Sequence, residues 1–296
     1  MLSGRTALLL LCAFPPPALA GFDGTGELPP PTSGAVSDPV LLRSAASMAR
    51  GTLAVSGLVE VASAPLLRAT TTTAQAQIDD LVRVRLGGRY AVSDRVDIGL
   101  GLPAIAVWTS EVDLQKGGPS PGDIRAYARF GLTKPDRDPA SPALGLAAEV
   151  RLPTGSSERY LGDGGPGAAL HLLGSTGAGP LLLTANAGLD LRTFAPEGNV
   201  ASGAGVLGGV ALGVRPFDPL VVNAELRGHS RLASRGPDGA PSDYVPVARG
   251  AEALLTGRAD VGPVQLTAGF GAGVVPGFAA ARWRAVLGGV CPSMND

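Results

Sequence analysis

Polar and apolar residues alternate one by one along much of this chain. In residues 124–130 the even positions are isoleucine, alanine, alanine and phenylalanine, whereas the odd positions are arginine, tyrosine and arginine. Successive side chains of a β-strand point to opposite faces, so this segment predicts a strand with one apolar and one charged face. Residues 144–152 repeat the pattern, with Glu149 and Arg151 opposite leucine, alanine and valine. Helical periodicity is hard to find, and after residue 20 no apolar run reaches the ~18 residues of a transmembrane helix.

The alternation predicts about twelve strands between residues 46 and 290. They are expected at 50–61, 82–90, 95–102, 124–130, 144–152, 168–174, 183–193, 203–214, 222–229, 249–259, 264–272 and 281–287. Shorter links are expected at 93–94, 134–141, 175–180, 216–219 and 262–263. Longer links rich in Gly, Pro or Ser are expected at 62–77, 109–121, 153–165, 194–201 and 232–246. An even strand number, with short turns on one side and long loops on the other, is typical of bacterial outer-membrane barrels. We therefore predict an all-β fold, a closed antiparallel transmembrane β-barrel.

A soluble β-sandwich is the main alternative, because its strands also hide one apolar face and expose one polar face. Two features of the pattern favour the barrel. The apolar faces consist of Leu, Val and Ala with almost no large aromatic residues, as expected where lipid covers them. The opposite faces combine Arg with Asp or Glu on many strands, which suits a lumen better than an open surface. Aromatic residues near the predicted strand ends are sparse, which counts against the barrel; they are Tyr90, Trp108, Phe194, Phe217 and Phe278.

The first twenty residues have the pattern of a secretory signal peptide. Arg5 precedes an apolar run at 7–14, and residues 18–20 offer a small-x-small cleavage site. A short membrane anchor is the alternative, but the run is far below the ~20 residues of a spanning helix. We expect four parts: a signal peptide at 1–20, a flexible N-terminal segment at 21–45, an outer-membrane barrel at 46–290 and a C-terminal tail at 291–296. Cys291 is then the one remaining cysteine, so no internal disulfide is expected.

Composition and motifs exclude several classes of function. Charged residues make up 17% of the chain, the formal net charge is −1, and no segment concentrates Lys or Arg, so nucleic-acid binding is not expected. Residues 203–208 fit G-x-G-x-x-G, but a strand-like run follows them, which does not suit a dinucleotide site. His171 and His229 are the only histidines, too few for a metal cluster and too loosely placed for a hydrolase. We expect no catalytic residue, no cofactor, no metal and no enzymatic activity.

Four short motifs resemble those of a known family. Gly122-Asp123-Ile124 opens a predicted strand, residues 150–155 read VRLPTG, residues 162–165 read GDGG, and residues 185–189 read ANAGL. Over roughly residues 120–195 the chain resembles outer-membrane barrels of the phenol-degradation meta-pathway transporter type. This resemblance implies a channel built on a barrel of the twelve-stranded type. The chain also resembles the N-terminal barrels of OmpA-like proteins, although no peptidoglycan-binding domain follows the last predicted strand.

The predicted inward faces carry most of the charge. We predict a lumen belt formed by Arg83, Arg85, Asp97, Asp123, Arg125, Arg129, Glu149, Arg151, Asp190, Arg192, Glu225, Arg227, Arg258, Arg282 and Arg284. Further candidate inward residues are Arg50, Arg89, Arg95, Glu60 and Glu252. Arginine suits such a belt because its fork binds two carboxylate oxygens and keeps its charge in a partly dry interior.

Two functions follow as hypotheses. The first is a pore or transporter for small solutes, preferring neutral or anionic ones because inward arginines outnumber acids. The second is a structural envelope barrel or anchor, of OmpA-like type, whose lumen its own charge pairs occlude. Either function places the protein in the outer membrane. The expected partners are outer-membrane lipid, the barrel-assembly machinery and, for the pore, small solutes.

Overall fold

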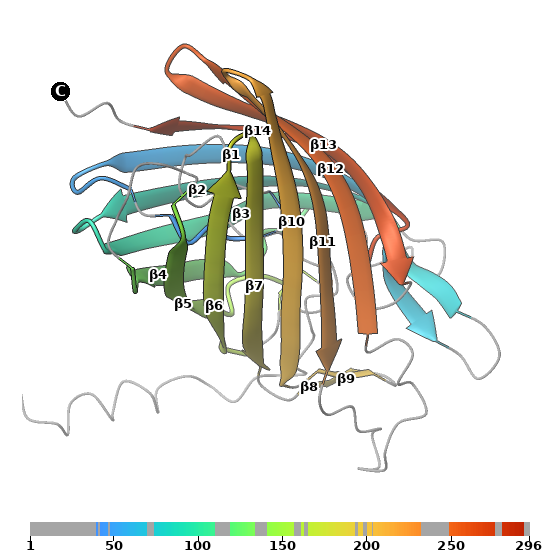
Figure 1. The fold of residues 1–296 in the computed structure, drawn as a ribbon. Helices are drawn as coiled ribbons and strands as arrows, with labels where there is room; N and C mark the ends of the chain where they lie inside the picture. The colour runs from blue at the N-terminus through green and yellow to red at the C-terminus, as the bar shows by residue number, and fades with distance from the viewer. Residues whose placement is uncertain are drawn as a thin grey trace, which may run out of the picture.

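A computed structural model describes most of the chain, and its strands form a closed antiparallel barrel (Figure 1). The described residues are 40, 42–46, 48–69, 74–109, 119–133, 141–156, 161–162, 165–192, 195–197, 200–202, 204–231, 249–275 and 280–292. Around the barrel the strand order is β1-β14-β13-β12-β11-β10-β7-β6-β5-β4-β3-β2, and β8 and β9 form a separate two-stranded sheet. The predicted fold class, an all-β closed barrel of twelve strands, is confirmed.

The barrel strands have lengths of eight to eighteen residues. They are β1 (Leu53–Ala69), β2 (Ala74–Ala91), β3 (Val96–Thr109), β4 (Ile124–Gly131), β5 (Ala143–Leu152), β6 (Gly167–Ala178), β7 (Leu181–Arg192), β10 (Gly205–Phe217), β11 (Leu220–Arg231), β12 (Arg249–Val261), β13 (Val264–Val275) and β14 (Trp283–Pro292). The small sheet consists of β8 (Ala195–Glu197) and β9 (Val200–Ser202). Within the described residues, no helix is long and apolar enough to span a membrane.

Each of the twelve predicted segments overlaps one barrel strand, but the first predicted loop is wrong. Residues 62–69 and 74–77 were expected in a loop and instead continue β1 and β2. Here the two strands pair with register shifts between Ser63 and Leu66 and again between Leu66 and Leu67. A bulge adds a residue on one strand only, so the strict alternation of side chains is interrupted here. Backbone pairing nevertheless continues along the hairpin. The β8–β9 hairpin also lies in a segment that was expected to be a loop.

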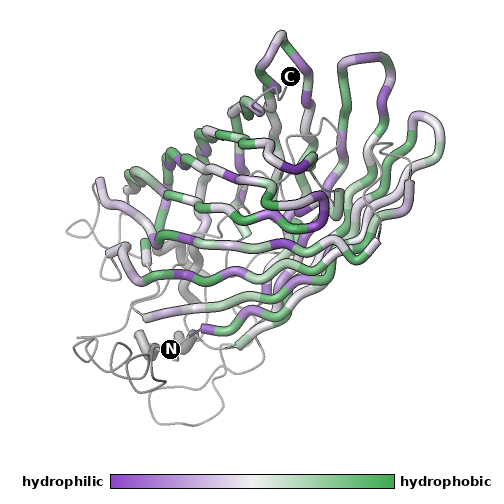
Figure 2. The backbone as a smooth tube through the Cα atoms, turned by 90° about the vertical axis from the view of Figure 1, so that its left-hand side faces the viewer, coloured by the Kyte–Doolittle hydropathy of each residue, from purple (hydrophilic) through white to green (hydrophobic). Residues whose placement is uncertain are grey.

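Side chains alternate between a polar interior and an aliphatic exterior. In β5, Ala147, Glu149 and Arg151 are buried, whereas Leu146 and Val150 are exposed. Every barrel strand exposes at least one large hydrophobic side chain. Figure 2 shows hydrophobic and hydrophilic positions alternating along the strands. This arrangement places charges inside and aliphatic side chains outside, the reverse of a soluble sandwich, and suits an exterior covered by lipid.

The two ends of the barrel differ in their connections. Residues 92–95, 179–180, 218–219 and 262–263 are short connections, and we call the end that they share the turn end. Gly179 and Gly262 begin two of these turns with φ values of +57° and +61°, and a proline follows each. Glycine is suited to both positions because its missing Cβ permits this left-handed backbone. Residues 132–142 form a longer connection at the turn end as well. Residues 110–123 and 232–248, also long, join strands at the opposite end, which we call the loop end.

Tyr127 lies against a glycine on the inner wall. Gly99 of β3 pairs directly with Tyr127 of β4, and a Cβ atom added to Gly99 would lie 2.1 Å from the Cζ atom of Tyr127. The tyrosine is 7% exposed, so its ring has little room to move away. Glycine inside a strand often marks such a close approach.

Gly99→Ala is therefore expected to destabilise the barrel by about 1–3 kcal/mol, because the new methyl group overlaps a confined ring. Urea unfolding of the barrel in detergent would measure the loss. Gly88→Ala is the matched control, since nothing lies within 4 Å of a Cβ added at Gly88 of the adjacent strand β2. Equal losses in the two variants would contradict the close contact between Gly99 and Tyr127.

Candidate functional site

A cluster of buried ion pairs lies where the first and last strands meet. Glu60 of β1 accepts hydrogen bonds from Arg83 (3.1 Å to each oxygen) and Arg85 (2.5 Å) of β2, and from Arg284 of β14. Arg284 also donates to Glu252 of β12 at 2.9 Å. Each guanidinium of this kind can serve two carboxylates, which keeps a buried charge paired.

Glu252 extends this cluster around the wall. It binds Arg227 of β11 at 3.0 Å and accepts a hydrogen bond from the backbone N–H of Ala281 at 2.6 Å. The ion pairs thus run from β2 across β1 and β14 to β11 and β12. We call Glu60, Arg83, Arg85, Arg227, Glu252 and Arg284 the Glu60 cluster.

A second set of ion pairs lines β2, β3 and β4 near the turn end. Asp97 of β3 accepts from Arg89 of β2, at 3.1 Å from Nε and 2.6 Å from Nη2. It also accepts from Arg129 of β4, whose Nε lies 2.7 Å from Oδ2. Asp97 and Arg129 face each other directly in the β3–β4 register. All three side chains are at most 3% exposed, so these charges compensate one another away from solvent.

A third set lines β4, β5 and β7. Glu149 of β5 accepts from Arg125 of β4 at 2.9 Å, and Arg151 lies 3.7 Å from the same carboxylate. Arg151 reaches on to Asp190 of β7, which also accepts from Arg192 at 2.9 Å. Carboxylates and arginines therefore alternate along this part of the wall. The wall is polar here and its charges are fixed by their partners.

Among the described residues that precede β1, Val40, residues 42–46 and Met48 lie inside the barrel. Met48 packs with Ala54, Ala91 and Val290 at the turn end, and the N–H of Gly51 donates to the carbonyl of Ala91 at 2.8 Å. From this anchor, residues 42–46 and Val40 lie in the interior, where Val40, Leu42, Arg43, Ser44 and Ala45 are buried. We call residues 40–48 the N-terminal segment, of which residues 41 and 47 are outside the described part of the chain.

The wall binds the main chain of the N-terminal segment through polar side chains. Asn186 of β7 accepts from the N–H of Arg43 at 2.7 Å and donates to the carbonyl of Arg43 at 2.8 Å. Ser175 of β6 accepts from the N–H of Ala45 at 3.0 Å, and Glu225 of β11 accepts from the N–H of Val40 at 2.8 Å. Arg129 donates to two carbonyls of the segment, those of residues 44 and 46. The segment's main-chain groups thus find partners on several strands.

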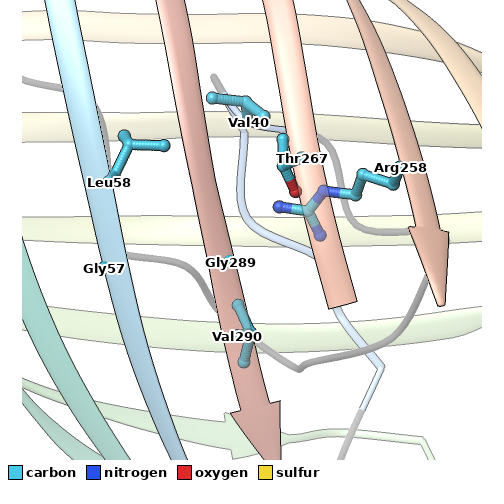
Figure 3. A pocket seen from close by; sticks show the side chains of 7 residues that line it. All are labelled: Val40, Gly57, Leu58, Arg258, Thr267, Gly289 and Val290. Carbon is cyan, nitrogen blue, oxygen red and sulfur yellow. The ribbon is translucent and has the colours of Figure 1, made fainter. Parts of the chain in front are cut away.

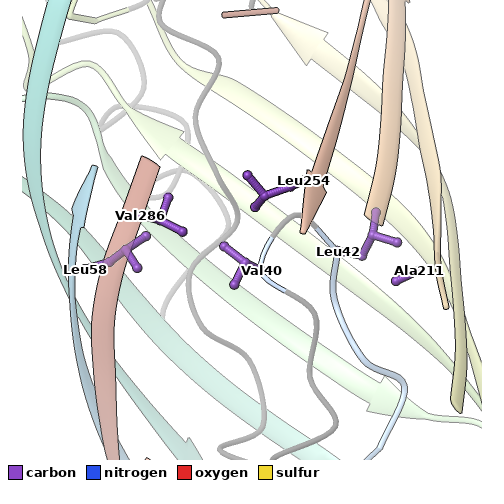
Figure 4. Packing of buried hydrophobic residues seen from close by; sticks show 6 residues of the cluster. All are labelled: Val40, Leu42, Leu58, Ala211, Leu254 and Val286. Carbon is purple, nitrogen blue, oxygen red and sulfur yellow. The ribbon is translucent and has the colours of Figure 1, made fainter. Parts of the chain in front are cut away.

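Apolar contacts also hold the N-terminal segment inside the barrel. Val40 and Leu42 belong to one buried cluster with Leu58, Ala211, Leu254 and Val286 (Figure 4). A Cβ atom added to Gly209 of β10 would lie 2.6 Å from a methyl carbon of Leu42, so the leucine occupies a notch in the wall. These residues lie on β1, β10, β12 and β14, whereas Glu149 and Asn186 lie on β5 and β7. The segment therefore crosses the lumen from one wall to the other.

A small gap remains beside Val40. It is lined by Val40, Gly57, Leu58, Arg258, Thr267, Gly289 and Val290 (Figure 3). Arg258 and Thr267 are paired in the β12–β13 register and are 3% and 4% exposed. The gap is thus bounded by the segment on one side and by β1, β12, β13 and β14 on the other.

Asp123 binds the backbone of the β5–β6 connection at the loop end. Its carboxylate accepts from the N–H of Gly155 at 2.8 Å, and the N–H of Ile124 donates to the hydroxyl of Thr154 at 2.9 Å. A Cβ atom added to Gly155 would lie 2.4 Å from the carbonyl oxygen of Leu161. The short motifs at 122–124 and 152–155 therefore hold the β5–β6 connection against the start of β4.

The structure buries or nearly buries the predicted belt residues with one exception. Arg83, Arg85, Asp97, Asp123, Arg129, Glu149, Arg151, Asp190, Glu225, Arg258 and Arg284 are buried, and Arg125, Arg192 and Arg227 are nearly so. Arg282 is exposed in the bend before β14, because the strand and its alternation begin only at Trp283. The further candidates Arg50 and Arg95 are exposed as well. A role of the belt in solute passage stays a prediction.

Periodicity could not reveal the N-terminal segment. Residues 40 and 42–45 fall in a stretch that was expected to be flexible, whereas the structure places them in the interior. The one signal was a pair of leucines and an arginine at 41–43 within a stretch rich in Gly, Pro and Ser. Asn186 was likewise missed as a binding residue, because a polar residue on an inward face carries no mark of its partner.

The glycine-rich run noted as a possible nucleotide motif is part of a strand. Residues 205–208 lie within β10, while residue 203 is outside the described part of the chain. Among the described residues, no group of three or more His, Cys, Asp or Glu side chains is placed to hold a metal ion.

Comparison with known proteins shows similarity of fold alone. No protein-family model matches the chain, and no curated protein matches it. Among solved structures, the COG4313 outer membrane channel from Pseudomonas putida F1 has a TM-score of 0.67 and 12% identity, covering 86% of this chain and 100% of that one. The NanC porin has a TM-score of 0.52 and 9% identity, covering 82% of this chain and 100% of the porin. The barrel is thus similar to those of outer-membrane channels and porins.

Proposed function

We propose that this protein is an outer-membrane channel for small neutral or anionic solutes. The observation that carries the proposal is the closed barrel with an aliphatic exterior and an interior rich in arginine. The interior arginines are Arg43, Arg83, Arg85, Arg89, Arg125, Arg129, Arg151, Arg192, Arg227, Arg258 and Arg284. The interior carboxylates are Glu60, Asp97, Asp123, Glu149, Asp190, Glu225 and Glu252. Because arginines exceed carboxylates in this set, the interior potential favours anions over cations.

The fold likeness supports the same proposal. The two solved structures reported above are named as an outer membrane channel and a porin, and both are covered over their whole length. The resemblance to transporters of the phenol-degradation meta-pathway type remains a prediction, as does the signal peptide at 1–20. Delivery by a barrel-assembly machinery is a prediction of the same kind.

A structural envelope barrel with an occluded lumen is the second candidate. One observation favours it: the N-terminal segment crosses the interior and is bound on both walls. In that case the ion pairs would serve as ties between strands, and ion flow would stay at background.

Reversal potentials in a salt gradient across planar bilayers test the first proposal. The unmodified protein is expected to conduct with a preference for anions. In the double variant Arg192→Gln/Arg227→Gln this preference should decrease, since two interior charges are lost. Folding is expected to persist because Asp190 keeps Arg151 and Glu252 keeps Arg284.

Arg95→Gln is the matched control, because Arg95 is exposed in the turn between β2 and β3. Its reversal potential should equal that of the unmodified protein. Absence of any conductance from correctly folded protein would refute the channel and favour the envelope barrel. A preference for cations would refute the proposed selectivity alone.

A further inference from the structure

We propose that the barrel interior is a binding site for a short extended peptide that carries an arginine, and that the N-terminal segment is its built-in ligand. Such a site concerns what the inner wall holds rather than what crosses the membrane. It therefore stands or falls separately from the proposed channel.

The first argument is that the wall recognises main-chain groups. Asn186 binds both the N–H and the carbonyl of Arg43. A neighbouring β-strand pairs with an extended residue through the same two main-chain groups. Ser175 and Glu225 accept from two further N–H groups, and Arg129 donates to two carbonyls. Main-chain contacts of this kind give affinity for extended peptides, while side-chain pockets give specificity.

The second argument is a pocket for the arginine. The guanidinium of Arg43 binds the carboxylate of Glu149 and lies 5.8 Å from the centroid of the Tyr127 ring. A carboxylate and an aromatic face together suit a guanidinium, through a charge-assisted hydrogen bond and a cation–π contact. Glu149 is fixed from the other side by Arg125, and Tyr127 lies in the gap at Gly99. The pocket is therefore made by the wall.

The third argument is a pair of apolar pockets that precede the arginine position. Leu42 enters the notch above Gly209, and Val40 lies with Leu254 and Val286. The next inward position of β10 is Ala211, a small residue that belongs to the same buried cluster as Val40 and Leu42. The inner wall thus selects apolar residues at the positions of Val40 and Leu42 and an arginine at the position of Arg43.

Tethering explains how a modest affinity keeps the segment in place. The segment joins the barrel at Gly51, only a few residues from Arg43. A short tether gives an effective concentration in the millimolar range, so a free peptide competes only when the tethered one is weakened. The site is therefore best tested in full-length protein whose segment is altered and whose wall is intact.

The test uses the full-length variant Leu42→Ser/Arg43→Ser and a labelled peptide with the sequence of residues 40–46, acetylated at its N-terminus. Fluorescence anisotropy in detergent is expected to show saturable binding to this variant and little binding to the unmodified protein. A peptide with serine at the arginine position should bind roughly tenfold more weakly or worse, because it loses a hydrogen bond to a charged group. Adding Asn186→Ala to the variant should weaken binding of the original peptide similarly.

Equal binding of the two peptides, or no binding to a folded variant, would overturn the proposal. Heat-modifiable migration on gels reports folding in the same preparation. If the double variant does not fold, Arg43→Gln alone weakens the tethered ligand, and the same peptide comparison applies with the same outcomes. Because anisotropy needs no ion flow, a protein that binds the peptide but never conducts would refute the channel alone. One that conducts but does not bind would refute the peptide site alone.

Discussion

Glu60→Gln is expected to destabilise the barrel by about 3–5 kcal/mol, because removal of one partner leaves buried charges uncompensated. The carboxylate of Glu60 is fully buried and binds Arg83, Arg85 and Arg284. Glutamine keeps the shape of the side chain but removes the charge that these three guanidinium groups share. Urea unfolding would measure the change in the free energy of unfolding, with loss of the heat-modifiable gel band as the readout.

An exposed pair provides the control for this prediction. Arg215 and Asp218 lie 3.9 Å apart at the β10–β11 turn, and the side chain of Asp218 is 89% exposed. Asp218→Asn is expected to change the free energy of unfolding by less than about 0.5 kcal/mol, since water screens exposed charges. If Glu60→Gln proved as mild, the interior would have to be wet enough to solvate the three arginines.

Ala187→Arg is expected to destabilise the barrel by about 2–4 kcal/mol in lipid vesicles, the cost of an arginine on the lipid face near the bilayer midplane. Ala187 lies in the middle of β7, is exposed, and pairs with Leu172 and Gly208 on either side. Unfolding in vesicles of defined lipid would measure the loss. Ala187→Leu should leave stability unchanged or raise it slightly. Similar stability of the two variants would mean that lipid does not cover this face.

The strands were predictable because each of them carries its own pattern. Alternation is a local property, and a strand such as β5 displays it over ten residues without reference to any other part of the chain. Inward residues then follow by parity, as with Glu149 and Arg151. Odd or even position does not predict the direction of a side chain where a strand has not yet begun, as at Arg282. It also fails where a bulge adds a residue, as near Ser63 in β1.

The position of the N-terminal segment inside the barrel was not predictable from the alternation of polar and apolar residues. The partners of Arg43 are Glu149 and Asn186, which lie 106 and 143 residues further along the chain. Val40 binds Glu225, 185 residues away. These contacts depend on the closed barrel that brings distant strands around one interior. A short irregular stretch with no repeat of its own gives no sign of them.

The seam between β1 and β14 bears on the order in which the molecule folds. Around the barrel, β10 pairs with β7, from which only the small β8–β9 hairpin separates it in sequence, and the other strands pair with their neighbours in the chain. The seam instead joins residues such as Glu60 and Arg284, which are 224 positions apart. Closing so long a loop costs more chain entropy than forming a hairpin, so we expect the seam to form last. The Glu60 cluster spans that seam, which makes it a contributor to the final step of ring closure. Substitutions at Glu60 are then expected to slow completion of the ring while the individual hairpins still form.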